Sequence, residues 1–256
     1  LYRNDGEGFA EVAQTAGLDD GDRGRALALG DFDSDGDLDL YLVNEHTTAT
    51  EGKNRFFRNR ADGRFTDGTM ILDANPHNGI ALADPNSGRS AGFFDYDSDG
   101  DLDLYLLNAR GGDESVNRLF RNDAGLFAET AQAVGLADGG NGRGLAIGDY
   151  DTDGDPDLYI ANQTGREQDQ FYRNDTGETG VFVPVGHALG LEFRSFEVGA
   201  IFGDYDGDGD LDLFVSNERD ENALWRNEGR RVSGRVGLVD AGFKQVAKDA
   251  MGAQTV

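Results

Sequence analysis

Short apolar runs alternate along the chain with polar segments that contain glycine. A glycine-rich run comes first, as in residues 26–30 and 144–148, and a longer apolar run follows it, as in residues 38–43. The first kind suits an inner strand that neighbouring backbones approach closely, and the second is typical of a strand buried on both faces. No helical periodicity extends beyond a few residues, so the pattern predicts short β-strands.

Two further strands are expected in each unit. A third is predicted at an aromatic-Arg-Asn tripeptide that occurs five times. Its copies are Tyr2-Arg3-Asn4, Phe57-Arg58-Asn59, Phe120-Arg121-Asn122, Tyr172-Arg173-Asn174 and Trp225-Arg226-Asn227. A turn containing glycine follows, and a fourth strand is expected to begin at Phe9, Phe65 or Phe127. The repeated Arg has two interpretations, pairing with the loop carboxylates or capping a sheet edge.

Four antiparallel strands repeated every 50–60 residues are typical of β-propeller blades. We therefore predict an all-β propeller fold of four complete blades and a partial one, belonging to a larger ring or an open assembly. The expected units are 1–19 (partial blade), 20–72, 73–137, 138–192 and 193–256. The third of these carries an insertion at residues 73–88, which either contributes to binding or is a neutral surface loop.

A nine-residue acidic loop separates the first two strands of each complete unit. Each copy has Asp at positions one, three, five, seven and nine, and Gly at position six. The copies begin at Asp31, Asp95, Asp149 and Asp204, at spacings of 64, 54 and 55 residues. Crowding so many carboxylates costs free energy unless a cation lies among them.

Calcium is the cation that this loop chemistry favours, because Ca²⁺ accepts six to eight oxygen ligands in flexible geometry. Positions one, three, five and nine would offer carboxylates, and position seven its backbone carbonyl. We predict about four Ca²⁺ ions. The candidate residues are Asp31, Asp33, Asp35, Asp37, Asp39, Asp95, Asp97, Asp99, Asp101, Asp103, Asp149, Asp151, Asp153, Asp155, Asp157, Asp204, Asp206, Asp208, Asp210 and Asp212. Unlike an EF-hand, the loop ends at position nine and continues into a strand. Pro156 removes a backbone N–H at position eight of the third loop, so we expect that site to differ slightly from the others.

Composition narrows the possible partners. The formal charge is −26, and four divalent ions would leave −26 + 8 = −18, so neither nucleic acid nor an anionic membrane is an expected partner. The chain has no Cys, which excludes a disulfide scaffold and thiolate metal sites. No run of 18 apolar residues is present, and we expect no membrane span. Because the sequence begins at Leu1, we expect it to be a processed or truncated piece of a longer chain.

The loops and their flanking motifs resemble the FG-GAP/VCBS repeat family. The chain repeats Asp-x-Asp-x-Asp-Gly-Asp-x-Asp followed by Leu-Tyr-Leu-x-Asn, with Leu-Tyr-Arg-Asn and Phe-x-Glu-Val-Ala between copies. This combination is closest to the branch associated with ASPIC/UnbV domains and is similar to integrin α blades. The resemblance implies a seven- or eight-bladed extracellular propeller with Ca²⁺ in the loop between strands one and two. Only four whole blades are present here.

These features predict a calcium-binding module, extracellular or at the cell surface (or periplasmic), for adhesion, recognition or scaffolding. Expected partners are a protein or glycan at the cell surface, or copies of the chain itself. The alternatives are a self-assembling fibre subunit joined through unpaired terminal strands and a propeller-based hydrolase or lyase. The enzyme hypothesis is the weaker one, because His46, His77 and His187 occupy non-equivalent places. Asn162 and Asn174 begin Asn-x-Thr sequons, whose use depends on the host.

Overall fold

The structure, a computed structural model, is all-β with one-turn helices. It describes residues 1–45, 53–69, 82, 88–109, 116–163, 168–191, 196–229 and 243–249. Four sheets have four antiparallel strands each, in sequential order, and we number them as blades one to four. Blade one contains β3 (Gly24–Gly30), β4 (Asp39–Asn44), β5 (Arg55–Asn59) and β6 (Phe65–Asp67). Blade two contains β7 (Gly88–Phe94), β8 (Asp103–Asn108), β9 (Arg118–Asp123) and β10 (Leu126–Glu129).

Blades three and four repeat this arrangement. Blade three contains β11 (Gly142–Gly148), β12 (Asp157–Asn162), β13 (Gln170–Asp175) and β14 (Val181–Pro184). Blade four contains β15 (Glu197–Gly203), β16 (Asp212–Asn217), β17 (Asn222–Asn227) and β18 (Phe243–Asp249). A two-stranded sheet, the partial blade, pairs β1 (Tyr2–Asn4) with β2 (Phe9–Glu11). The predicted β-propeller blades, four complete and one partial, are confirmed.

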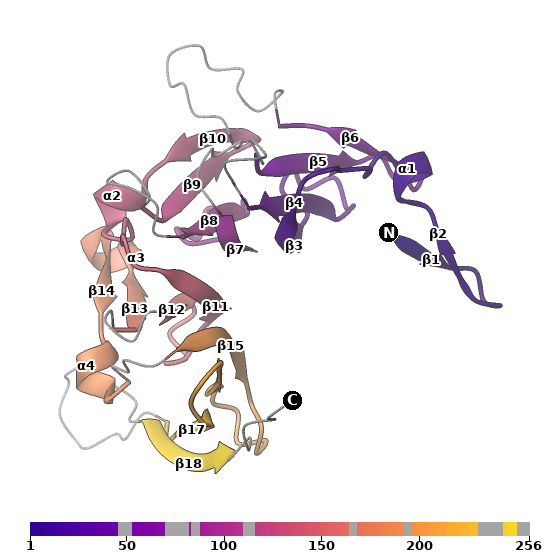
Figure 1. Ribbon diagram of the computed structural model, residues 1–256. Coiled ribbons are helices and arrows are strands. Elements are labelled where there is room, and N and C mark those ends of the chain that lie inside the picture. The colour runs from indigo at the N-terminus through magenta and orange to yellow at the C-terminus, as the bar shows by residue number, and fades with distance from the viewer. Residues whose placement is uncertain are drawn as a thin grey trace.

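Successive blades follow one another along an arc (Figure 1), and their first strands lie against each other: β3 against β7, β7 against β11, and β11 against β15. Glycine makes this approach possible. A Cβ on Gly144 would lie 2.6 Å from the Gly199 Cα, and a Cβ on Gly30 would lie 2.9 Å from the ring of Phe93. The glycine-rich composition of the first strand is therefore explained by contact between blades.

The second strand of each blade contributes to the hydrophobic core. Every residue of β8 and β12 is buried, as predicted for a strand covered on both faces. The corresponding strand at the end of the arc, β16, differs, because its Phe214 is 40% exposed. Burial of the second strand thus depends on a neighbouring blade as well as on its own sequence.

One-turn helices follow the fourth strands: α1 (Ala13–Ala16), α2 (Ala131–Val134) and α4 (Gly186–Leu189). Each ends at a glycine with positive φ, namely Gly17, Gly135 and Gly190 at 79°, 83° and 72°. A fourth, α3 (Thr176–Thr179), lies between β13 and β14. The sequence did not predict them, because four residues are too few to show helical periodicity. No helix in the described residues is long and apolar enough to cross a membrane.

The insertion at residues 73–88 lies outside the described residues, except for Leu82 and Gly88. Leu82 is 1% exposed, and its carbonyl accepts a 2.7 Å hydrogen bond from the Tyr41 hydroxyl. Tyr105 makes the equivalent bond to the carbonyl of Leu136 at 2.9 Å. This part of the insertion therefore packs into blade one as ordinary core.

Candidate metal centre

Each acidic loop is folded around the carboxylate at its first position. In the loop of blade one, Asp31 Oδ1 accepts the N–H of Asp35 at 3.0 Å, and Asp31 Oδ2 accepts the N–H of Gly36 at 2.9 Å. Gly36 has φ +93°, and the position-six glycines of the other loops are also left-handed, so the predicted sharp bend is confirmed. Position four is left-handed as well, at Ser34 (φ 55°) and its counterparts. This second bend was not predicted from the sequence, because Ser at position four gives no clear signal of a positive φ.

The position-nine carboxylate, the first residue of each second strand, is held from both sides. Asp103 Oδ1 accepts the Asn122 N–H at 2.8 Å, and Asp103 Oδ2 accepts the Tyr96 N–H at 2.9 Å. The same pair of bonds occurs at the other three blades, with distances from 2.7 to 3.4 Å. All four position-nine residues are at most 1% exposed. This carboxylate is thus part of the fold as well as a candidate ligand.

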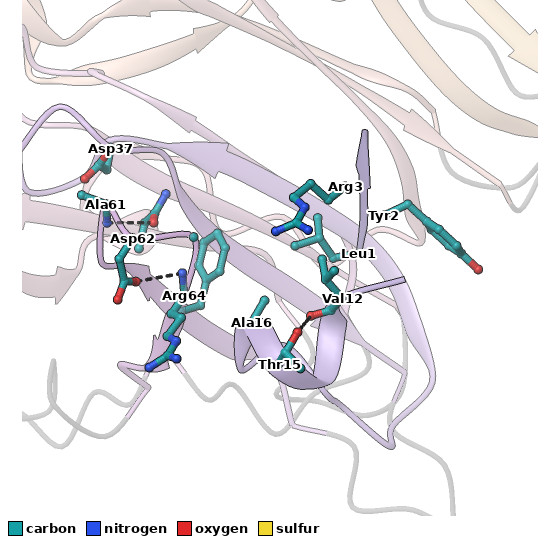
Figure 2. Close-up of a pocket in the computed structure, with 13 residues that line it drawn as sticks. Leu1, Tyr2, Arg3, Val12, Thr15, Ala16, Asp37, Ala61, Asp62 and Arg64 are labelled. Carbon is teal, nitrogen blue, oxygen red and sulfur yellow. Dashed lines mark hydrogen bonds between the residues drawn. The ribbon is translucent and has the colours of Figure 1, made fainter. Parts of the chain in front are cut away.

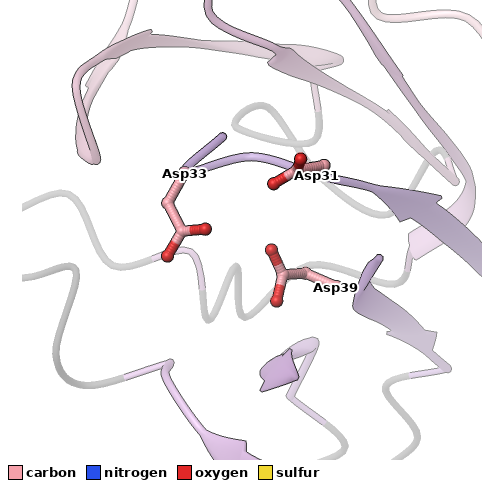
Figure 3. Close-up of side chains that lie close together, drawn as sticks. All are labelled: Asp31, Asp33 and Asp39. Atoms are coloured by element: carbon pink, nitrogen blue, oxygen red, sulfur yellow. The ribbon is translucent and has the colours of Figure 1, made fainter. Parts of the chain in front are cut away.

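Three carboxylates converge in every loop. One oxygen from each lies within 4.8 Å of the other two, and Figure 3 shows the three side chains of blade one pointing toward one another. The converging groups are Asp31, Asp33 and Asp39; Asp95, Asp97 and Asp99; Asp149, Asp151 and Asp157; and Asp204, Asp206 and Asp212. Positions one and three therefore always converge, joined by position nine in three loops and by position five in the second.

The remaining candidates lie outside these groups of three. They are Asp35, Asp37, Asp101, Asp103, Asp153, Asp155, Asp208 and Asp210. Position five accepts the backbone N–H of position seven in each loop. At position seven, Asp155 Oδ1 accepts a 3.0 Å bond from the Ser98 hydroxyl of the preceding blade. The metal role of all twenty Asp residues stays a prediction.

Buried carboxylates lie close to one another in these clusters. Burial raises the pKa of Asp39 to about 6, of Asp103 to about 7 and of Asp157 to about 8, against the lowering effect of two backbone N–H bonds each. Neighbouring carboxylates add to the rise. Burial also raises the pKa of Asp33 and Asp97. A cation among them would favour the ionised forms.

Position three also carries unsatisfied acceptors. Oδ1 of Asp33 and Oδ1 of Asp97 are buried and have no hydrogen-bond partner among the described residues. Buried carboxylate oxygens without a partner are costly, and a hard cation is one group that satisfies them. The donor set, all oxygen and partly unsatisfied, therefore fits a hard divalent ion.

The repeated Arg forms ion pairs, and two of its copies pair with loop carboxylates, which is one of the two interpretations from the sequence. Arg58 contacts Asp33 and lies 3.3 Å from Asp35, and Arg226 lies 3.7 Å from Asp206, so two copies face their own loops. Arg121, Arg173 and Arg226 also pair with the acidic residue two positions further along, at 2.6, 2.7 and 2.6 Å.

Sequence reasoning missed the residues that join each loop to the next blade. The position-two aromatic packs against an aromatic at the fourth strand of the next blade: Phe32 with Phe127, Tyr96 with Phe182, and Tyr150 with Phe243, at centroid distances of 6.0, 6.2 and 6.0 Å. The Asn of the tripeptide also reaches the preceding loop. The signal was present, since an aromatic occupies position two in all four loops.

The two sequon asparagines are inaccessible in the folded chain. Asn162 and Asn174 are each 1% exposed. The Asn162 amide donates to the carbonyl of Gln168 at 2.8 Å, and the Asn174 amide donates to the carbonyl of Tyr96 at 2.8 Å. Glycan attachment at either residue would require breaking these contacts, so neither sequon supports a modified folded state.

A cavity of about 510 Å³ lies between the partial blade and blade one (Figure 2). It is lined by Leu1, by Arg3 of β1, by Asn59 of β5, and by Phe65 of β6. In later blades, residues equivalent to Asn59 and Phe65 receive the loop of the preceding blade. The cavity is therefore the receiving face of blade one, which has no preceding loop among the described residues.

Comparison with known proteins agrees with this architecture. The chain is 30% identical over 176 residues to cartilage acidic protein 1 of Homo sapiens, and equally to the proteins of that name from Mus musculus and Xenopus tropicalis. These alignments cover 63% of the chain but 24% of each relative, so the chain spans about a quarter of their length. The model of the FG-GAP-like repeat matches three times, at residues 46–106, 95–160 and 149–215, which together cover more than half of the chain. The chain therefore belongs to the FG-GAP-like repeat family.

Proposed function

We propose that each acidic loop binds one Ca²⁺, and that the ions stabilise the blades. The observation that carries the proposal is the convergence of three carboxylates in all four loops. In blade one, Asp31, Asp33 and Asp39 would supply oxygens, with Asp35 and the Asp37 carbonyl as further candidates. The corresponding residues would serve in the other blades.

The chemistry of the site favours calcium over other common ions. Three carboxylates within a few ångströms carry a charge that a monovalent ion compensates only in part. Mg²⁺ demands near-octahedral geometry and retains its waters, whereas Ca²⁺ accepts irregular oxygen sets. No Cys is present to bind a softer metal.

The function that this architecture supports best is a non-catalytic, calcium-stabilised extracellular repeat module for recognition or scaffolding. The relatives carry the name cartilage acidic protein, which supports a place outside the cell, and we infer a protein or glycan as the partner there. FG-GAP-like repeats over more than half of the chain support a non-enzymatic role. A screen of glycosidase and esterase substrates tests that part, and turnover abolished by His187→Ala would overturn it.

Calorimetric titration of the chelator-treated chain with Ca²⁺ tests the metal proposal. We expect about four sites, and about three in a variant that combines Asp95→Asn with Asp97→Asn. Asp5→Asn and Asp62→Asn are the matched control, because these residues lie in exposed turns outside the acidic loops. A folded chain that takes up no Ca²⁺ would rule the proposal out.

Self-assembly through the terminal strands is a second candidate. Tyr205, the position-two aromatic of blade four, is 51% exposed, and Phe9 of the partial blade is 74% exposed. Inside the arc, the equivalents of these residues pack together. Tyr205 of one copy would contact Phe9 and Asn4 of the next, which is a head-to-tail contact that generates fibres when it does not close.

Light scattering with Ca²⁺ tests this candidate. Assembly should grow with concentration and weaken in both Tyr205→Ser and Phe9→Ser. Leu126→Ser is the control, because this residue is also exposed but lies in blade two, away from both ends of the arc. A wild-type chain that stays monomeric at high concentration would refute the assembly.

A further inference from the structure

The four acidic loops are connected by one continuous path of hydrogen bonds. The path uses three groups in each blade: the position-two backbone, the position-nine carboxylate, and the Asn of the aromatic-Arg-Asn tripeptide. In blade one, the Asn59 N–H donates to Asp39 Oδ1 at 2.7 Å, and the Phe32 N–H donates to Asp39 Oδ2 at 3.4 Å. The carboxylate therefore links position two to the third strand of its own blade.

The step to the next blade is made by a side-chain amide. Asn122 of blade two donates its Nδ2–H to the carbonyl of Phe32 at 2.8 Å, while its own backbone N–H donates to Asp103 at 2.8 Å. One Asn thus contacts the loop of the preceding blade and a candidate ligand of its own. It is fully buried, so water cannot replace either bond without opening the joint.

The same step recurs at the next two joints. Asn174 Nδ2 donates to the Tyr96 carbonyl at 2.8 Å and the Asn174 N–H to Asp157 at 2.8 Å. Asn227 Nδ2 donates to the Tyr150 carbonyl at 2.7 Å and the Asn227 N–H to Asp212 at 2.8 Å. Among the described residues, the path ends at Tyr205, whose N–H donates to Asp212 at 3.1 Å.

The position of these bonds within the loop matters for metal binding. Position two lies between the carboxylates at positions one and three, which converge in every loop. Its N–H is fixed by position nine, and its carbonyl by the next blade, so both peptide groups between the two ligands are held in place. Rotating either peptide would move a converging carboxylate.

We propose that Asn122, Asn174 and Asn227 are positioning residues for the cation site of the preceding blade, and that they couple neighbouring sites. This proposal rests on calcium binding by the loops. Binding at one loop orders positions one to three and thereby favours the arrangement that the next blade's Asn holds, and the converse follows from linkage. The coupling is carried by defined contacts rather than by proximity alone.

The test isolates the site of blade one. A variant carrying Asp95→Asn, Asp149→Asn and Asp204→Asn keeps the loop of Asp31 intact. In this background, Asn122→Ala should weaken Ca²⁺ binding about five- to tenfold, a typical size for coupling between sites. Asn174→Ala is the matched control: it makes the equivalent bonds one joint further along, and should change the dissociation constant less than twofold.

The outcomes separate the two proposals. If the folded background variant binds no Ca²⁺, the calcium proposal itself fails. If it binds, and Asn122→Ala and Asn174→Ala have the same effect, the positioning role is wrong. Circular dichroism verifies folding, and Asn122→Ser replaces Asn122→Ala if the latter unfolds. Native mass spectrometry should still count one ion in Asn122→Ala at saturating Ca²⁺, because the ligands remain.

Discussion

The loop of blade three and the loop of blade four have the same acidic pattern but different surroundings. Tyr150, at position two of the third loop, is 1% exposed and lies against Phe171 and Phe243. Tyr205, at the same position of the fourth loop, is 51% exposed. The difference is the next blade, which supplies an aromatic and an Asn to the third loop. The environment of a loop is therefore a property of the joint between two blades.

The largest effect expected is from removing calcium. If each site has a dissociation constant of about 0.1 mM, Ca²⁺ at about 1 mM adds roughly 1.4 kcal/mol per site to the free energy of unfolding. Four independent sites would add about 6 kcal/mol. Thermal unfolding with excess EDTA should show a loss of this order. Hydrogen exchange should show blade four opening first, because no blade in the described part of the chain covers its loop. Uniform protection of all four blades after chelation would contradict the expected difference between blade four and the other blades.

The two position-two tyrosines should differ sharply on truncation. Tyr150→Ala should lower the free energy of unfolding by about 3–5 kcal/mol, since it removes a fully buried ring between two blades. Tyr205→Ala should cost less than about 1 kcal/mol, because half of that side chain already contacts water. Denaturant unfolding of both variants measures the difference. Equal losses would show that Tyr205 is covered in solution.

The position-nine carboxylates offer a smaller contrast. Asp103→Ala leaves the buried N–H groups of Tyr96 and Asn122 without acceptors, at a cost of about 2–4 kcal/mol that persists in EDTA. Asp212→Ala should cost about half as much, because the bond that its carboxylate accepts from the Tyr205 N–H is only partly buried. Chemical denaturation in EDTA separates this structural cost from the loss of a ligand. An Asp103→Ala variant with wild-type stability in EDTA would contradict this structural role of the carboxylate.

The smallest predicted effect concerns one residue that departs from the repeat. Asn54, Asn117 and Asn222 each accept a backbone N–H in their blades, and Asp169 takes this place in blade three. Burial, together with a hydrogen bond to Glu197, raises the pKa of Asp169 to about 9. The folded state therefore holds a proton that the unfolded state releases, so stability from this group falls as pH rises from about 4 to 9.

Asp169→Asn should remove that dependence and stabilise the chain at pH 7, with no gain below about pH 4. Melting temperatures across this range, compared with those of an Asp5→Asn control at an exposed turn, measure the effect. A gain that is the same at pH 4 and pH 8 would mean that packing, and not titration, explains it.

Much of the fold could be predicted from local patterns. The alternation of apolar runs with glycine and acidic segments located the four-stranded blades, because strand burial and tight turns leave a direct mark on residue type. The one-turn helices such as α1 have no such signal in the sequence, since their stability comes from packing and a C-terminal glycine. Within the site, positions one and three were predicted to converge and do. Position five joins them only in the second loop, at Asp99.

The sequence by itself determined the repeat, the strand order within each blade, and the placing of five carboxylates on each loop. Only the tertiary structure decided which carboxylates meet, and that Asn122 binds Phe32, a residue 90 positions away. The physical reason is range. Turn conformation and strand burial depend on neighbouring residues, whereas a contact between blades exists only after both have folded and stacked. The shared Asn of the tripeptide is therefore visible in the sequence as a repeat, but its role appears only at the joint.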